Sequence, residues 1–273
     1  MKDNTIKIIF FGDIVGKPGR FAVRDFLAEN KYDFVIANVE NASHGFGLTE
    51  KNYNEFREYG IDAMTCGNHI WDKKDIYTYI DNADCLLRPI NYPAGTAGVG
   101  SRIFEKEGFK VGVINVLGRV FMNLVDPYWD QVAEEIKRIK EITPIVVLDF
   151  HAEATAEKIC YGKYCSDIGL SAFFGTHTHV QTADDSIING MAYITDVGFC
   201  GASDGVIGMD YNSSLSRFLT AIPDRYEVAK GQTSQLNALE VEIDVNSGCA
   251  LAVKRIFCNK NNIEKEEESE KED

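Results

Sequence analysis

Short, mostly apolar runs recur along this chain, and they constrain its fold more than any other feature. Ile6–Phe11, Phe34–Val39 and Asp62–Cys66 are each followed by residues with helical spacing or a helix start signal. Continuous apolar strands indicate sheets that are covered on both faces, because a half-exposed strand would alternate polar and apolar residues. The helices expected after these strands are Gly19–Asn30, a helix capped by Thr49 that runs to Tyr59 and stops at Gly60, and Trp71–Ile80.

The rest of the chain adds hairpins to this alternation. Arg102–Phe104 and Lys110–Leu117 flank a glycine-containing turn, and so do Leu239–Val245 and Ala250–Phe257. Strands that alternate with helices early and form hairpins late predict an α/β sandwich of mixed sheets. Between the hairpins we expect strands at Ile145–Phe150, Ser171–Phe174 and Met191–Val197, and helices through Val132, Ile136 and Ile139 and over Ala154–Tyr164.

One large domain accounts for most of the chain. The sequence has 273 residues and is 45% hydrophobic, which is enough for a large buried core. We find no internal repeat and no long linker, so residues 1–258 are expected to form a single domain. Residues 259–273 are expected to be a disordered acidic tail, because Glu264–Asp273 contains seven acidic residues and two lysines.

The charge balance excludes one class of partner. The net charge is −14, and −9 remains for the other residues when the tail is set aside. A body this acidic argues against a protein that is held to nucleic acid by bulk electrostatics. A small anionic ligand stays possible, because bound cations can invert the local field.

The sequence also predicts a cytoplasmic location. No stretch approaches the ~20 apolar residues that cross a bilayer, and Met1–Asn4 leads into a strand pattern without the apolar core of a signal peptide. The seven cysteines include no CxxC pair and are expected to be reduced thiols.

Metal-ligating side chains follow several of the expected strands. Carboxylate, amide and imidazole groups together suit manganese, iron or zinc ions. They are too numerous for one tetrahedral site and suit two adjacent ions that share a bridging carboxylate. Two ions ~3.5–4 Å apart are a recurring device for phosphoryl chemistry. The residues concerned are Asp13, Glu40, Asn41, Asn68, His69, His151, His177 and His179.

The histidine pair in His177-Thr178-His179 is the strongest single indication of a metal site. Side chains two apart on a strand face the same way, so we expect both rings to reach one site. Each of the other pieces has a structural interpretation when taken alone, such as a turn at Gly12-Asp13 or a buried histidine at His151. Their joint occurrence after several strands favours a shared site.

These segments resemble the motif series of the calcineurin-like metallophosphoesterases, and most closely the YmdB-type metallophosphodiesterases. The resemblance runs from Ile8 to about Lys230 and continues more weakly to Phe257. The motifs that carry it are Phe11-Gly12-Asp13-Ile14-Val15-Gly16, Glu40-Asn41-Ala42, Gly67-Asn68-His69-Ile70-Trp71-Asp72, Asp149-Phe150-His151-Ala152-Glu153-Ala154-Thr155, and Gly175 to Asp184 with its two histidines.

The resemblance implies a four-layer α/β/β/α sandwich of two mixed sheets with a dimetal site on one edge. It implies that Glu40 bridges the ions and that a water between them is the nucleophile. It gives Asp13 and His179 to one ion, and Asn68, His151 and His177 to the other. It further implies that His69 is the catalytic histidine and that Asn41 is a phosphate or outer hydrogen bonder.

Two residues depart from the broad superfamily and match the YmdB-type branch. Val15 stands where a histidine is usual, and Glu40 replaces the usual bridging aspartate. The loss at Val15 removes a ligand, which either water or Asn41 replaces. Iron or manganese is the expected metal, with zinc as the alternative.

The implied activity is metal-dependent hydrolysis of a small phosphodiester, such as 2′,3′-cAMP or 3′,5′-cAMP. Two alternatives stay open: a phosphomonoesterase with the same site, and a regulatory protein that binds metal or nucleotide with little turnover. No membrane partner is expected, and a homo-oligomer stays open.

Several further residues have an open role. His44 is either a loop residue or part of the substrate mouth, and Arg88 and Arg119 either anchor loops or pair with phosphate. Asp184 and Asp196 are candidates for orienting the imidazoles. The aromatic side chains Trp71, Phe121 and Tyr193 are expected in the core, with stacking on a base as the alternative.

Overall fold

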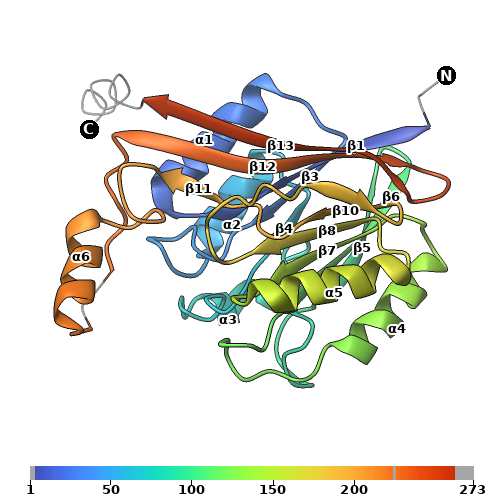
Figure 1. The fold of residues 1–273 in the computed structure, drawn as a ribbon, viewed down its shortest axis with the longest axis horizontal. Helices are drawn as coiled ribbons and strands as arrows, with labels where there is room; N and C mark the ends of the chain where they lie inside the picture. The colour runs from blue at the N-terminus through green and yellow to red at the C-terminus, as the bar shows by residue number, and fades with distance from the viewer. Residues whose placement is uncertain (1–3, 224–225, 262–273) are drawn as a thin grey trace.

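Two stacked β-sheets lie between outer helices in this computed structural model, which describes residues 4–223 and 226–261 (Figure 1). Apolar side chains fill three spaces: between helices α1 and α2 and the first sheet, between the two sheets, and between the second sheet and helices α4 and α5. The predicted four-layer α/β/β/α sandwich is therefore confirmed.

The first sheet has the order β2-β11-β12-β1-β3-β4, and β13 pairs with β12. Its parallel neighbours β1, β3 and β4 come from the N-terminal part of the chain, while β12 and β13 form the predicted C-terminal hairpin. Its strands are β1 (Thr5–Phe11), β2 (Asp13–Ile14), β3 (Phe34–Asn38), β4 (Ala63–Thr65), β11 (Phe199–Ala202), β12 (Thr233–Asp244) and β13 (Ala250–Asn261).

The second sheet has the order β5-β6-β7-β8-β10-β9. β6, β7, β8 and β10 run parallel, and β5 pairs with β6 as the predicted hairpin. Its strands are β5 (Ser101–Lys106), β6 (Phe109–Leu117), β7 (Val146–His151), β8 (Ala172–Thr176), β9 (Ser186–Ile188) and β10 (Met191–Ile194).

The described helices cover the outer faces of the sheets, except α6, which projects from the body at one end (Figure 1). Thr49 caps α2 as predicted, because its side chain accepts a hydrogen bond from the amide of Asn52. The helices are α1 (Gly16–Glu29), α2 (Glu50–Glu58), α3 (Ile76–Tyr79), α4 (Trp129–Lys140), α5 (Thr155–Asp167), α6 (Tyr211–Thr220) and a 3₁₀ turn at Ile80–Asn82. None of those in the described residues is a long apolar helix able to span a bilayer.

The core between the sheets explains the continuous apolar strands. Ile8, Phe10 and Ile36 of the first sheet and Val147 and Phe174 of the second are buried in one cluster. The rings of Phe10 and Phe174 stack across the interface, with centroids 4.4 Å apart. Alternate residues on the same strands point to the outer helices, so both faces of each strand are apolar.

Some sequence-based element predictions are wrong. The helix expected over Trp71–Ile80 is reduced to α3, because the preceding residues form turns in which the carbonyl of His69 accepts from the amide of Asp72. The strand expected to reach Val197 ends at Ile194, since the amides of the next two residues bond to the side chains of Asp184 and Thr182. The elements β2, β9, β11 and α6 were not predicted.

The C-terminal strand passes the predicted domain boundary. β13 runs to Asn261, three residues beyond position 258. The remainder of the predicted tail, residues 262–273, lies outside the described residues.

Candidate metal centre

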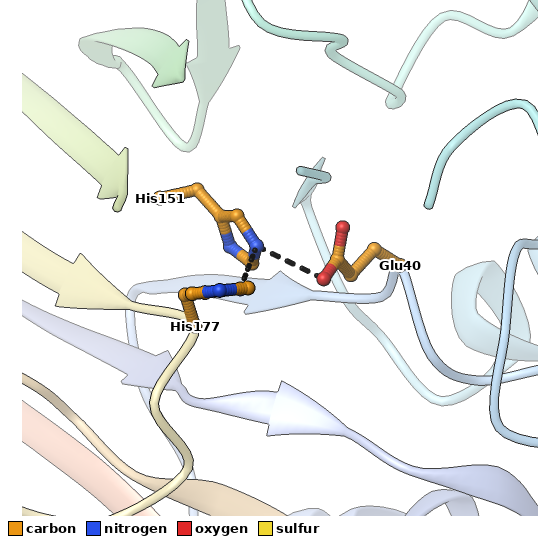
Figure 2. Close-up of side chains that lie close together, drawn as sticks. All are labelled: Glu40, His151 and His177. Carbon is orange, nitrogen blue, oxygen red and sulfur yellow. Dashed lines mark hydrogen bonds and ion pairs between the residues drawn. The ribbon is translucent and has the colours of Figure 1, made fainter. Parts of the chain in front are cut away.

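The polar residues at the strand ends meet at one edge of the sandwich. Glu40 follows β3, His151 ends β7, and His177 follows β8 (Figure 2). The Nε2 atom of His151 lies 2.9 Å from Glu40 Oε1 and 3.0 Å from His177 Nδ1. Asn68 Oδ1 lies 3.2 Å from the same nitrogen. These ligand atoms from two imidazoles, a carboxylate and an amide surround a candidate metal position.

A second group of donors lies on the other side of Glu40. Asp13 Oδ1 lies 3.8 Å from His179 Nε2, and the Asn41 amide nitrogen lies 3.3 Å from that nitrogen and 3.4 Å from Glu40 Oε1. Glu40 Oε1 therefore lies close to members of both groups, and Asp13 Oδ1 also lies 3.7 Å from His151 Nδ1. The side chains of Asp13 and Glu40 are fully buried, which is unusual for carboxylates that lack a cation.

Two buried oxygen atoms in this second group are unpartnered. Within residues 4–223 and 226–261, Asp13 Oδ1 and Asn41 Oδ1 have no hydrogen-bond partner. The two ends of an Asn amide are distinguished by their surroundings. Half a turn of the Asn41 amide would bring its oxygen to the position beside His179 and Glu40. Both oxygens fit a cation better than they fit a protein interior without one.

The histidine pair is placed differently from the prediction. β8 ends at Thr176, and His177 and His179 have left-handed backbone conformations, with φ of 100° and 63°. The two histidines therefore do not share one strand face, contrary to the prediction. His177 faces His151, whereas His179 faces Asp13, so the two rings meet different groups of donors.

A buried ion pair holds the loop between these histidines. The Asp196 carboxylate accepts hydrogen bonds from the amide and the hydroxyl of Thr178, at 3.1 and 2.6 Å. Lys158 Nζ donates to the same oxygen at 2.6 Å, and both charged side chains are almost completely buried. Asp196 thus contacts the loop rather than an imidazole, and Asp184 bonds to Thr182 and Thr195 instead.

The second nitrogen of each candidate ligand histidine is also engaged. His179 Nδ1 lies 3.0 Å from the carbonyl of Ile207, and His151 Nδ1 lies 3.0 Å from Thr176 Oγ1. His177 Nε2 lies 3.0 Å from Glu153 Oε2. Such contacts fix the ring orientation and leave the opposite nitrogen for a metal. Glu153 belongs to the motif Asp149 to Thr155, but no role was predicted for it, because no local sequence signal pairs it with His177.

Asp149 ties the two sheets together behind the site. Its carboxylate accepts from Thr65 Oγ1 and Thr176 Oγ1, both at 2.6 Å, and from Asn38 Nδ2 at 2.9 Å. Asn38 and Thr65 belong to the first sheet, and Thr176 belongs to the second. Burial raises the pKa of Asp149 to about 7, with opposition from His151 and the two hydroxyls.

Electrostatics differ between the groups of the site. Burial opposes ionisation of Glu40, but His151 and His69 outweigh it and lower the pKa of this carboxyl far below its usual range. Burial raises the pKa of Asp13 despite His179 and His151. For His177, burial and the neighbouring His151 lower the pKa to about 3. The lowered pKa favours the neutral form of His177, which ligates metal, whereas Glu40 outweighs burial at His151 and raises the pKa of that ring to about 9.

His69 has a different position from the ligand histidines. Its Nδ1 lies 2.9 Å from Asp72 Oδ2, and its backbone amide donates to Glu40 Oε2 at 3.0 Å. Its side chain is 30% exposed, and its ring meets Phe46 edge-on at 4.8 Å. With Nδ1 engaged, Nε2 is the nitrogen that can reach a substrate.

A cavity of ≈ 200 Å³ opens onto the site. Its floor contains candidate ligands and His69, and its walls are mainly apolar. The lining residues are Glu40, Asn41, Phe46, His69, His177, His179, Val206, Ile207, Met209, Ser214, Phe218 and Tyr226. None of the wall residues was singled out from the sequence.

The remaining predicted residues lie away from this cavity. His44 is exposed, and Arg88 donates to the carbonyls of Pro89 and Ala97, which makes it a loop anchor. Arg119 is exposed, and its backbone amide bonds to Glu157. Of the aromatic residues, Tyr193 is buried and Trp71 is partly buried, stacked on Tyr77. Phe121 is 88% exposed, so its assignment to the core was wrong.

Known proteins share both the sequence pattern and the fold. A family model described as YmdB-like protein matches residues 9–256. The chain is 45% identical to a 2′,3′-cyclic-nucleotide 2′-phosphodiesterase of Bacillus subtilis, over 93% of this chain and 97% of the relative. A crystal structure of a phosphatase from Mycoplasma pneumoniae superposes with a TM-score of 0.87 at 35% identity, over 94% of each chain. The crystal structure of a protein from Thermus thermophilus has the same TM-score and identity and covers 93% of this chain and 100% of its own.

Proposed function

The chain belongs to the YmdB-like protein family and is a phosphoesterase, and from this premise we propose that it hydrolyses a cyclic nucleotide at a dimetal site. The substrate is a 2′,3′- or 3′,5′-cyclic nucleotide, and the activity named for the Bacillus subtilis relative supports the first of these. The observation that carries the dimetal proposal is the Glu40 carboxylate, which stands between two groups of ligand atoms.

The proposed ligand set follows from these contacts. Asn68, His151 and His177 would hold one ion, Asp13 and His179 would hold the other, and Glu40 would serve both. Asn41 completes the second set in the place that Val15 leaves empty, which is supported by its unpartnered amide oxygen among the described residues. Nitrogen and oxygen donors of this kind accept iron, manganese or zinc, and we propose iron or manganese.

Ions held by these residues would supply the positive charge that lowers the pKa of a water and neutralises the phosphate. The residues of this chain then have separate tasks. Glu40, His151 and the loop of Thr178 keep the ligand atoms fixed, so no reorganisation is needed during reaction. In its doubly protonated form His69 donates the Nε2 proton to the leaving alkoxide and is left neutral, while Asp72 accepts the hydrogen bond from Nδ1–H.

Two measurements test this function. Elemental analysis of the purified protein should give two equivalents of iron or manganese per chain. One tightly held zinc, or no metal, would contradict the dimetal proposal. With added Mn²⁺, bis-p-nitrophenyl phosphate should be hydrolysed faster than p-nitrophenyl phosphate, and a strong preference for the monoester would identify a phosphomonoesterase instead.

A variant at the bridging residue separates an enzyme from a regulatory binder. Glu40→Gln keeps the shape of the side chain and removes the bridging charge, so metal-dependent hydrolysis should be lost. Glu58→Gln on the exposed face of α2 is the matched control. If the cellular function survived the loss of hydrolysis in Glu40→Gln, this result would support a regulatory binding protein instead of an enzyme.

We also propose a cytoplasmic location. All seven cysteines are free, and Cys66, Cys165 and Cys200 are buried thiols whose pKa burial raises. Unpaired cysteines in this number are typical of a reducing compartment. Fractionation of the native host would test the location.

A further inference from the structure

The outer wall of the cavity is aromatic and does not belong to either sheet. Phe46 lies in the loop after β3, Phe218 lies on α6, and Tyr226 follows α6. The rings of Phe46 and Tyr226 are 6.4 Å apart, and the guanidinium of Arg217 lies 3.9 Å from the Tyr226 ring centroid. Figure 1 shows α6 standing out from the body of the molecule.

Phe218 is the least covered of these rings. Its side chain is 80% exposed, although it lines the same cavity as Glu40 and His177. An exposed phenylalanine that lines a candidate active site is free to contact a ligand, and aromatic side chains are common in such linings. Every nucleobase has a π face that can stack on such a ring.

The charge of the cavity lining limits the chemical classes of ligand that fit the cavity. Among the described residues that line the cavity, none is a lysine or an arginine. A substrate that carried a second phosphate group would therefore lack a cationic partner away from the metal centre. The part of the substrate that extends from the reacting phosphate is expected to be uncharged and flat.

Base-specific hydrogen bonding is also sparse on this wall. Val206, Ile207 and Met209 offer apolar side chains, and the Ser214 hydroxyl already donates to the carbonyl of Asp210. Such a wall can stack a base without reading its edges. Recognition is then tolerant of base identity and sensitive to the presence of a base.

We propose that Phe46, Phe218 and Tyr226 form a stacking wall that selects mononucleotides, with the base against Phe218 and the phosphodiester at the metal centre. This inference rests on the proposed cyclic-nucleotide hydrolysis and names the part of the substrate that the metal centre does not recognise.

The test compares two cyclic diesters, one with a base and one without. The ratio of kcat/KM for 2′,3′-cAMP to kcat/KM for glycerol 1,2-cyclic phosphate is measured on the metal-loaded enzyme. Phe218→Ala should lower this ratio about fivefold or more, the range found for one stacked base. Leu219→Ala is the matched control, because Leu219 is 76% exposed on the same helix and does not line the cavity.

A binding measurement keeps this inference separate from the proposed function. Calorimetry compares adenosine 3′-monophosphate with ribose 3-phosphate on the wild type and on Phe218→Ala. Weaker binding of the nucleotide alone supports the wall, even if the enzyme hydrolyses neither cyclic diester and the proposed function fails. Equal loss for both ligands, or no loss, overturns the wall. Equal kcat/KM of the wild type for both diesters also overturns it, while the hydrolytic function stands.

Discussion

The metal centre and the aromatic wall are built in opposite ways. The candidate ligands follow strands of two packed sheets, and Asp149 and Asp196 connect their loops from behind. The wall comes from a loop and from α6. Among the described residues of α6, Ser214 alone is buried. Under the proposed function, the groups that meet the reacting phosphate are positioned by the core, whereas the proposed contacts to the base lie on a segment with little buried surface.

The largest effect is expected at His69, where the core meets the cavity. His69→Gln removes the acid, so kcat for a cyclic nucleotide should fall about 10²- to 10⁴-fold. The fall should be much smaller for bis-p-nitrophenyl phosphate, because its leaving group needs no proton. His44→Gln is the control, since His44 is exposed and outside the cavity lining. Equal losses on the two substrates would contradict the role of a proton donor.

The next prediction tests whether the buried ion pair of Lys158 and Asp196 holds the loop between His177 and His179. Lys158→Met leaves the Asp196 carboxylate buried without its cation, which should lower the free energy of unfolding by about 3–5 kcal/mol. Lys163→Met on the exposed face of α5 is the matched control for denaturant unfolding. The double variant Lys158→Met/Asp196→Asn should regain part of the stability but not the metal content. A single variant as stable as the control would refute the role assigned to this pair.

A smaller effect is expected at Glu153, which supports His177 from the edge of the site. Glu153→Ala should weaken metal binding about 10- to 100-fold in competition with a chelator, because the imidazole loses the partner that orients it. Glu153→Gln retains an acceptor and should be affected less. Glu134→Ala on the exposed face of α4 serves as control. Unchanged metal affinity in the alanine variant would show that the ring is held by other contacts.

The smallest effect compares two helix caps. The side chain of Asp210 accepts from the amide of Ser213 at the start of α6, as Thr49 does for α2. Asp210→Ala and Thr49→Ala should each cost about 1 kcal/mol. Hydrogen exchange should localise the loss to Tyr211–Thr220 in the first variant, whereas the second should lower global stability because α2 packs on the core. A global loss in both variants would mean that α6 is coupled to the sheets.

The sequence predicts the core-built region better than the exposed one. β1, β3 and β7 are long apolar runs, and each leads to a polar residue that the structure brings to the same edge. Parallel strands end together, so their order along the chain is enough to gather these residues. The left-handed conformation of His177 and His179 could not be predicted, because the residues that contact this loop, Asp196 at Thr178 and Ile207 at His179, are distant in sequence.

The aromatic wall shows what sequence reasoning misses. Leu215, Phe218, Leu219 and Ile222 recur at helical spacing, and Asp210 is a cap signal, so α6 had a local signature. Its role does not follow from that signature, because an apolar stripe normally indicates burial in a core. Phe121 was misassigned to the core because its aromatic ring was likewise taken as a sign of burial. Glu153 was missed because its partner His177 is distant in sequence and is reached only after β7 and β8 pair.

The pairing of the first strand has a consequence for the synthesis of the protein. β1 lies between β3 and β12, and its partners in β12 are residues 238–244. The strand that leads to Asp13 therefore stays half-paired until most of the chain has left the ribosome. A nascent chain interrupted before β12 would hold Asp13 only through β2, which pairs with β11. Stable placement of Asp13 at the candidate site is thus expected to follow completion of the C-terminal hairpin.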